Sequence, residues 1–227
     1  MIQCCNLKYS ELKKKDVIDS NGERIGEVID STFNYSDNRL ELKHIVLGGG
    51  VIEELLERIK ARPDIDPVCN VSDIDSISDK VYLNVDKESL CKTMDKGIST
   101  DSDFLYSNIS KMKVVDVDGI RLGNVIDLWF DKASHLWLIL GGSFFEELLE
   151  RLHAIPDIDL LVPHDDIESI KKGVIKLKKT KFQLESTCES EYEKLKRELT
   201  VKGTRKDARY TQIKMGAGGS GLSRGLA

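Results

Sequence analysis

Short apolar runs, separated by glycines and acidic turns, occur in the same order in both halves of the chain. The stretches DVIDSNGERIGEVID and VVDVDGIRLGNVID each place an Asx-Gly pair, Asn21-Gly22 or Asp118-Gly119, between two β-branched runs. This pattern predicts a β-hairpin in each half. We expect a two-residue type I′ turn, because both of its central residues need the positive φ that these dipeptides readily adopt.

More strands are predicted after each hairpin. Gly26 and Gly123 interrupt the second strand, where a glycine usually marks a bend or a close approach of backbones, as at the corner of a small barrel. A third strand follows, LELKHIVL or HLWLIL, and each half then ends in a strand, an acidic turn and a strand. Many short strands with turns between them favour a small β-barrel over an alternating βα fold.

A glycine run and a short amphipathic helix are predicted between the third strand and the closing strands, in GGGVIEELLERIKARPDID and GGSFFEELLERLHAIPDID. Apolar residues recur at i, i+3, i+4 and i+7, which places them on one helical stripe. Glu147 and Arg151 are spaced for an i,i+4 ion pair. The two stripes form the candidate interaction surface and consist of Ile52, Leu55, Leu56 and Ile59 and of Phe145, Leu148, Leu149 and Leu152.

The stripes allow three interpretations. Each helix packs on its own barrel as a lid, which we favour, or offers its stripe to a partner. In a third arrangement the two helices pack on each other, as symmetric patches do between subunits. The choice decides whether the repeated helices are structural or functional.

The matching patterns indicate duplication of one folded module. Tyr9 aligns with Tyr106 and Phe33 with Phe130, and the helix-bearing segments are largely identical. The prediction is a mainly β (α+β) fold of two tandem modules with inserted helices, a C-terminal helix and a flexible tail. The boundaries that we predict are 1–88 for the first module, 89–105 for the linker, 106–181 for the second module and 182–227 for the helix and tail.

The duplicated motif D-x-x-G-x-x-x-G-x-V-x-D begins at Asp19 and at Asp116, and VPHDDIESI follows in the second copy. These residues resemble the PRC-barrel family, which includes a domain of the photosynthetic reaction-centre H subunit and the C-terminal domain of the ribosome maturation factor RimM. The resemblance covers both modules and implies two tandem PRC-type β-barrels. It leaves the C-terminal helix and tail outside.

Barrels of this family mostly serve as binding or assembly modules, so the resemblance implies a non-catalytic scaffold or adaptor. Such a protein binds protein partners or associates with itself through its barrels or inserted helices. Archaeal relatives include partners of the FtsZ-based division machinery, which suggests a cell-division or other cytoplasmic assembly. An RNA-binding or ribosome-maturation role, by analogy with RimM, is the alternative.

Charge divides the chain into an acidic body and a basic tail. The net charge is −5, yet 200–227 carries a surplus of positive charge. Before it, STCESEYEKLKRELTV predicts a helix capped by Ser186 or Thr187, and we expect the glycine-rich end to be disordered. The tail either contacts nucleic acid or anionic membrane or only solubilises the chain. Its candidate electrostatic residues are Lys202, Arg205, Lys206, Arg209 and Lys214.

We expect no enzymatic activity, no cofactor, no metal site and no small-molecule substrate. The sequence contains no P-loop, no G-x-S-x-G elbow and no H-E-x-x-H helix, and its four histidines do not match between the copies. We interpret the matching Asp30 and Asp127 as hairpin-end residues. The five irregularly spaced cysteines argue against a disulfide framework. Without a secretory signal or a long apolar run, a cytoplasmic location is expected.

Overall fold

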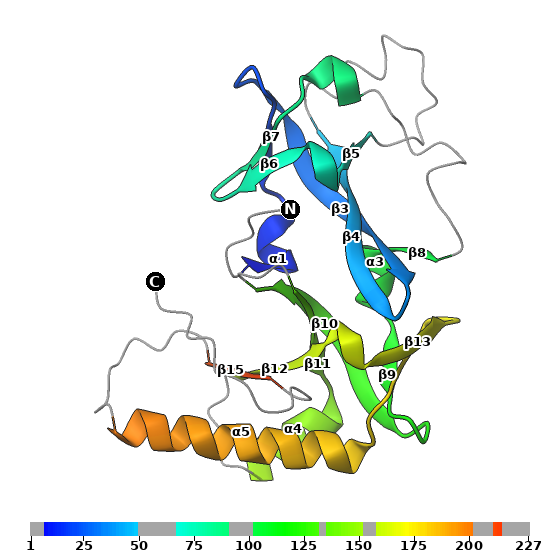
Figure 1. Cartoon of the computed structure of the whole chain (residues 1–227), viewed down its shortest axis with the longest axis vertical. Coiled ribbons are helices and arrows are strands. Elements are labelled where there is room, and N and C mark those ends of the chain that lie inside the picture. The colour runs from blue at the N-terminus through cyan, green and yellow to red at the C-terminus, as the bar shows by residue number, and fades with distance from the viewer. Residues whose placement is uncertain are drawn as a thin grey trace. The chain divides into compact units, whose positions relative to one another are not determined.

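Strands in two sheets make up most of the structure, which is a computed structural model (Figure 1). The chain divides into two compact units. Unit 1 comprises Met1–Ile109 with Trp129–Leu136, and unit 2 comprises Ser110–Leu128 with Trp137–Ala227. The residues that the structure describes are 7–49, 67–90, 102–131, 135–151, 158–201 and 211–214.

The first module supplies a sheet of order β5-β4-β3-β2-β7-β6, with β8 paired to β3. Neighbouring strands run antiparallel except β2 and β7, which are parallel. The strands are β2 (Asp16–Ile18), β3 (Arg24–Ser36), β4 (Arg39–Gly48), β5 (Val68–Asn70), β6 (Ile74–Ile77), β7 (Val81–Leu83) and β8 (Asp103–Leu105). Short helical turns are α1 (Tyr9–Leu12), η1 (Val71–Asp73) and η2 (Lys87–Leu90).

The second module repeats this order as β13-β14-β9-β10-β11-β12, with β15 added beside β12 and β1 paired to β10. The strands are β1 (Leu7–Lys8), β9 (Lys113–Val115), β10 (Arg121–Phe130), β11 (Leu136–Gly141), β12 (Ile158–Pro163), β13 (Ile167–Lys171), β14 (Val174–Leu177) and β15 (Thr211–Lys214). The helices are α3 (Tyr106–Ile109), α4 (Ser143–Arg151), η3 (His164–Asp166) and α5 (Lys181–Val201). The two tandem barrel-type modules that the sequence predicts are therefore confirmed.

Both Asx-Gly hairpins form, but the predicted type I′ turns are wrong. Gly22 has a φ of +81°, whereas Asn21 does not adopt a positive φ. The N–H of Gly22 donates to the carbonyl of Asp19, and Asp19 pairs with Glu23 across a three-residue loop. The loop ends on a left-handed glycine because the Asp19 side chain accepts the N–H groups of Asn21 and Glu23. The second copy repeats every one of these bonds.

Two-residue turns with positive φ occur at two other positions, neither of which was predicted. Asp37 and Asn38 have φ of 50° and 60° and join β3 to β4. Lys172 and Gly173, at 49° and 74°, join β13 to β14. Both turns match the right-handed twist of the paired strands, as type I′ geometry does.

The predicted close approach at Gly123 is confirmed. A Cβ atom built on Gly123 would overlap the carbonyl oxygen of Gly141, and it would lie 3.5 Å from the ring of Phe145. Gly142, which follows Gly141, has a φ of +129° and turns the chain from β11 into α4. The two strands and the helix thus meet where no side chain fits.

Within unit 1, the first strand of each module pairs with a strand of the other module. Strand β1 of the first module pairs with the end of β10, opposite Trp129 and Phe130. Strand β8, in the predicted linker, pairs with β3 opposite Thr32, Phe33 and Asn34. This reciprocal exchange was not predicted, because strand pairing between distant segments leaves no local pattern.

The exchange brings the aligned aromatic residues together in unit 1. Tyr9 stacks on Tyr106 with 3.7 Å between ring centroids, and Phe33 stacks on Phe130 at 6.4 Å. Tyr9 also meets Phe33 edge to face at 5.9 Å. All four side chains are buried, so the cluster contributes both buried area and ring contacts to the core.

Helix α5 begins earlier than predicted. Its first residue is Lys181, because Thr180 and Gln183 form a reciprocal cap: the Gln183 N–H donates to Thr180 Oγ1 and the Thr180 N–H to Gln183 Oε1. The predicted caps at Ser186 and Thr187 are wrong and lie inside the helix. Within the described ranges, no helix is both long and apolar enough to cross a membrane.

We expect Gly123→Ala to lower the free energy of unfolding by about 2 kcal/mol or more, because the added methyl group displaces backbone rather than a flexible side chain. The measurement is the urea midpoint of the full chain. Gly119→Ala is the control for a strained φ without crowding, since no atom lies within 4 Å of its Cβ position. An equal loss in both variants would contradict the close approach as the cause.

Candidate functional site

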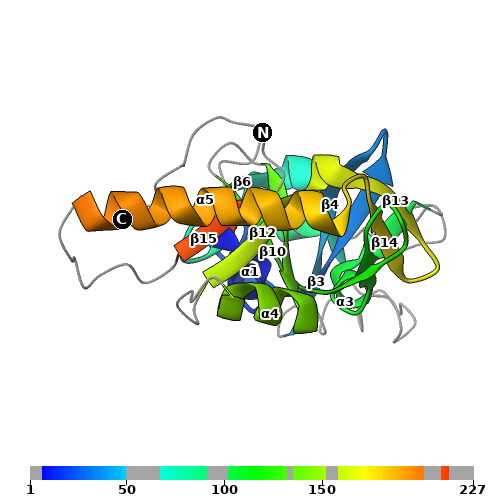
Figure 2. The same ribbon diagram turned by 90° about the horizontal axis from the view of Figure 1, so that it is seen from below.

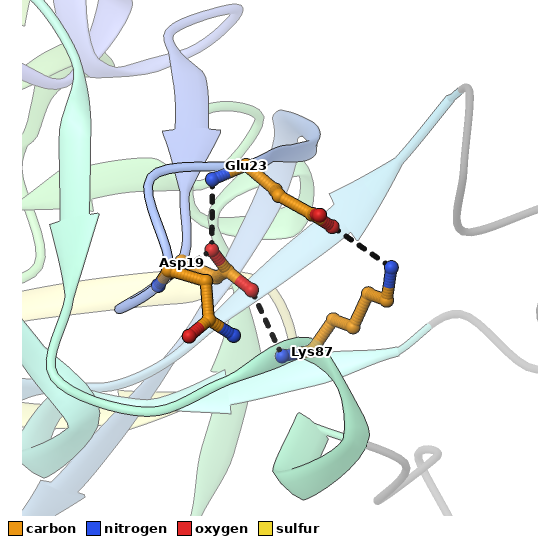
Figure 3. A network of polar contacts seen from close by, with 4 residues as sticks. Asp19, Glu23 and Lys87 are labelled. Carbon is orange, nitrogen blue, oxygen red and sulfur yellow. Dashed lines mark hydrogen bonds and ion pairs between the residues drawn. The ribbon is translucent and has the colours of Figure 1, made fainter.

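The aspartate that begins the duplicated motif is buried, and its carboxylate accepts hydrogen bonds from backbone N–H groups. Asp19 Oδ1 accepts the N–H groups of Asn21 and Glu23 at 2.9 Å each, and Oδ2 accepts that of Lys87 at 3.3 Å. Asp19 is 4% exposed. Figure 3 shows this carboxylate between the hairpin and the segment after β7. We name this arrangement, 19–23 with 85–88, the first corner.

Asp116 makes the same contacts in the second module. Its Oδ1 accepts the N–H groups of Asp118 and Ile120 at 2.9 and 2.7 Å, and its Oδ2 accepts that of Lys181 at 2.8 Å. Asp116 is fully buried. Lys181 opens α5, so the carboxylate also lies at the N-terminus of this helix, where negative charge is favourable. We name 116–120 with 179–182 the second corner.

The rims of the two corners differ in chemistry. In the first corner, Lys87 Nζ donates to Glu23 at 2.8 Å, and this hydrogen bond raises the pKa of Lys87 (Figure 3). In the second corner, Ile120 takes the place of Glu23. Phe182 follows Lys181 where the exposed Glu88 follows Lys87. A polar, ion-paired rim is therefore replaced by two apolar side chains.

Both apolar side chains of the second corner face solvent. Ile120 is 49% exposed and Phe182 is 76% exposed. The large apolar residues exposed in the described ranges are these two and Ile126. Single exposed apolar residues are common on protein surfaces, so these two gain interest from the polar residues that the first corner has in their places.

Cations flank the two apolar residues in the sequence. Arg121 directly follows Ile120 and is exposed, and Lys179 pairs with Asp166 at 2.9 Å. Lys181 Nζ lies 4.6 Å from the centroid of the Phe144 ring, a cation–π contact. The second corner therefore combines apolar side chains with the exposed Asp118 and the cations Lys179 and Lys181, and the first combines two further acidic residues, Asp86 and Glu88, with an ion pair.

Neither Ile120 nor Phe182 was a candidate from the sequence. The hairpin containing Ile120 was predicted, and Phe182 was placed at the predicted module boundary, but the two segments are far apart in the chain. Alignment of the copies carried a usable signal, because Ile120 stands where the first copy has Glu23. Only the structure shows that Ile120 and Phe182 belong to the same corner.

Helix α4 confirms the predicted helix in the second module, and two residues of its stripe are buried. Phe145 is 2% and Leu148 is 1% exposed, while Leu149 is half-buried. Leu152 lies outside the described residues, as do the first-module candidates Ile52, Leu55, Leu56 and Ile59. In the described part of the stripe, Phe145 lies beside Gly123 of the same unit, and Leu148 is as deeply buried.

Arg151 at the end of α4 does not form the predicted pair with Glu147. It reaches α5 instead, where its Nη2 lies 2.7 Å from Glu189 and its Nη1 lies 3.9 Å from Glu185. Helix α5 offers Arg151 two carboxylates, whereas Glu147 offers one. A guanidinium has several N–H donors, so contact with two acceptors is favoured. Leu184 and Cys188 of α5 are fully buried.

The basic tail is described only at β15. Lys214 ends this strand, which pairs parallel to β12. The other candidate electrostatic residues, Lys202, Arg205, Lys206 and Arg209, lie outside the described residues. Contact of the tail with nucleic acid or membrane stays a prediction.

The other residues with reactive or ligating side chains have structural roles or are buried. Asp30 Oδ1 accepts the N–H of Ser107 at the start of α3, so Asp30 links β3 to this helical turn instead of lying at a hairpin end. Cys69 and Cys188 are free and buried, and burial raises the pKa of each thiol to about 12. Among the described residues, no group of three or more His, Cys, Asp or Glu side chains is placed to hold a metal ion.

Comparison with known families identifies the PRC-barrel domain in both modules. The model of the PRC-barrel domain matches residues 6–90 and 101–184, which is most of the chain and one match for each module. No curated protein matches the chain. The motif aspartates, Asp19 and Asp116, fall within the two matched ranges.

We expect Asp116→Asn to lower the free energy of unfolding by about 2–3 kcal/mol, because the amide NH₂ would face the N–H of Lys181 and leave a buried donor unpaired. Urea denaturation checks this. Asp118→Asn is the matched control, since Asp118 is exposed and should change stability by less than about 0.5 kcal/mol. Equal stability of the two variants would contradict the structural role of the carboxylate.

We expect Leu148→Asp to lower the free energy of unfolding by about 3 kcal/mol or more, because it places an unpaired charge among buried residues. Thermal and urea midpoints test it, with the exposed Glu150→Ala as control. Wild-type stability combined with lost association in light scattering would make the stripe a partner surface. The same expectation holds for Leu55→Asp, which lies outside the described residues.

Proposed function

Because the chain belongs to the PRC-barrel domain family, we propose that it is a non-catalytic adaptor that binds a protein partner through the second corner. The observation that carries the proposal is the exposed pair Ile120 and Phe182, held on either side of the buried Asp116 carboxylate. The equivalent rim of the first corner is polar and ion-paired. The difference cannot be a requirement of the fold, since both corners form the same backbone contacts.

The chemistry of the second corner defines the partner. Apolar side chains fit against Ile120 and Phe182, and carboxylates fit beside Arg121 and Lys181. The matching surface is a protein segment in which aliphatic or aromatic residues stand next to aspartate or glutamate. Aromatic anchors with a charged border are the usual centre of such interfaces.

The wider role proposed here is that of a scaffold in a cytoplasmic assembly, with cell division as one setting. A tandem chain suits this role because its two modules carry different rims and so bind different surfaces. The RimM-like role in RNA binding is the competing function, and nuclease sensitivity separates the two.

We expect the double variant Ile120→Glu/Phe182→Glu to weaken partner binding by about thirtyfold, the loss of roughly 2 kcal/mol typical of a central anchor. The variant copies the first corner, where Glu23 and Lys87 pair, so it should fold normally. Full-length wild type and variant are each purified from native cells with and without nuclease. A protein that co-purifies with the wild type but not with the variant is the partner. Titration calorimetry with that purified partner then gives the affinity ratio.

Glu23→Gln/Lys87→Gln in the first corner is the matched control and should leave the affinity unchanged. Equal unfolding midpoints for all three proteins establish that binding, and not folding, has changed. Equal affinity of the second-corner variant and the wild type would refute the proposed site. A partner lost on nuclease treatment would favour the RNA-binding function.

A further inference from the structure

The outer edge of β12 is covered by a strand from the far end of the chain. Strand β15 pairs with β12 in parallel register, with Ile158 opposite Thr211 and Leu161 opposite Lys214. Nine residues, 202–210, separate the strand from the end of α5. Both strands belong to unit 2.

Strand β12 needs such a cover more than its counterpart does. It spans Ile158–Pro163, and its Leu160, Leu161 and Val162 are buried. A long apolar edge strand presents unpaired N–H and C=O groups to any extended chain nearby. The counterpart in the first module, β5, spans only Val68–Asn70, and in the described ranges it pairs with β4 alone.

The way β15 is attached resembles a bound peptide more than a built-in strand. It adds to the sheet after the module is complete, and within the described chain β12 is its sole strand partner. Both views show it alongside the middle of α5 and not beyond the end of that helix (Figures 1 and 2). Pairing of an extended segment with a sheet edge is a recognised mode of peptide binding, in which backbone hydrogen bonds supply the affinity.

We propose that the edge of β12 is a strand-addition site whose ligand is the segment Thr211–Lys214, supplied either by the same chain or by a second copy. The sequence that fits the edge is present in every copy, so exchange of this strand links chains without any new contact surface. The proposal is independent of the second corner and of the function proposed for it.

Local concentration decides which copy supplies the strand. A segment tethered by a connection of nine residues has an effective concentration in the millimolar range. A dilute chain therefore fills its own edge. Chains gathered in an assembly, or chains whose own strand cannot reach, exchange strands instead.

The first test uses the full chain with Gln212→Pro/Ile213→Pro and a labelled synthetic peptide of residues 209–215. Successive N–H groups of a strand point to opposite sides, so one of the two prolines removes a donor that faces β12. We expect the peptide to bind this variant at least about tenfold more tightly than wild type, whose edge is filled at millimolar effective concentration. The same peptide with both prolines is the control and should not bind.

The second test removes residues 203–209 from the full chain and keeps β15. Two residues then join α5 to the strand, and the three Cα–Cα steps from Val201 to Thr211 span at most about 11 Å. We expect twice the monomer mass in light scattering at micromolar concentration. The deletion combined with the two prolines should remain monomeric.

Failure of the peptide to bind the proline variant at millimolar concentration would overturn the strand-addition site. A deletion variant that stays monomeric while the peptide binds would overturn a second copy as the occupant. Ile120→Glu/Phe182→Glu should leave both results unchanged, so failure here and failure of the proposed adaptor function are separate outcomes.

Discussion

One buried carboxylate in each module fixes how the first hairpin meets the end of that module. Asp19 and Asp116 each accept two N–H groups from their own hairpin and one from the segment after the last strand. A buried carboxylate is costly unless its oxygens are filled by donors, so the three donors cannot move independently. The start of α5 at Lys181 and the placement of Ile120 both depend on this bond set. The corner is rigid for that reason, and its rim is free to vary.

The exchange of first strands within unit 1 gives the duplication a physical meaning. Strand β1 completes β10 and strand β8 completes β3, so each module lacks a strand that the other provides. Stacking of Tyr9 on Tyr106 and of Phe33 on Phe130 pairs each aromatic with its own counterpart. Within unit 1, the duplication therefore appears as contacts between equivalent residues of the two copies.

Local pattern predicted the elements that local chemistry controls. The two hairpins, the succession of strands along each module, the close approach at Gly123 and the helix after Gly142 all follow from glycine positions and apolar spacing. The turn type was wrong because a side chain, Asp19 or Asp116, competes with the preference of the dipeptide. The exchanged strands and β15 were missed because their partners are distant in sequence. The apolar corner was missed for the same reason, since the segments that contain Ile120 and Phe182 meet only through Asp116.

A duplicated chain separates the requirements of the fold from those of binding. Positions that the fold requires hold the same residue type in both copies, as the motif aspartates and Gly22 and Gly119 do. Positions with the same backbone role and a different exposed side chain are not fixed by the fold. Glu23 against Ile120 is such a pair, and exposure of Ile120 to water contributes nothing to stability. Burial by a partner would turn the same side chain into binding energy, which is why we propose the divergent rim, and not the repeated motif, as the place where a partner binds.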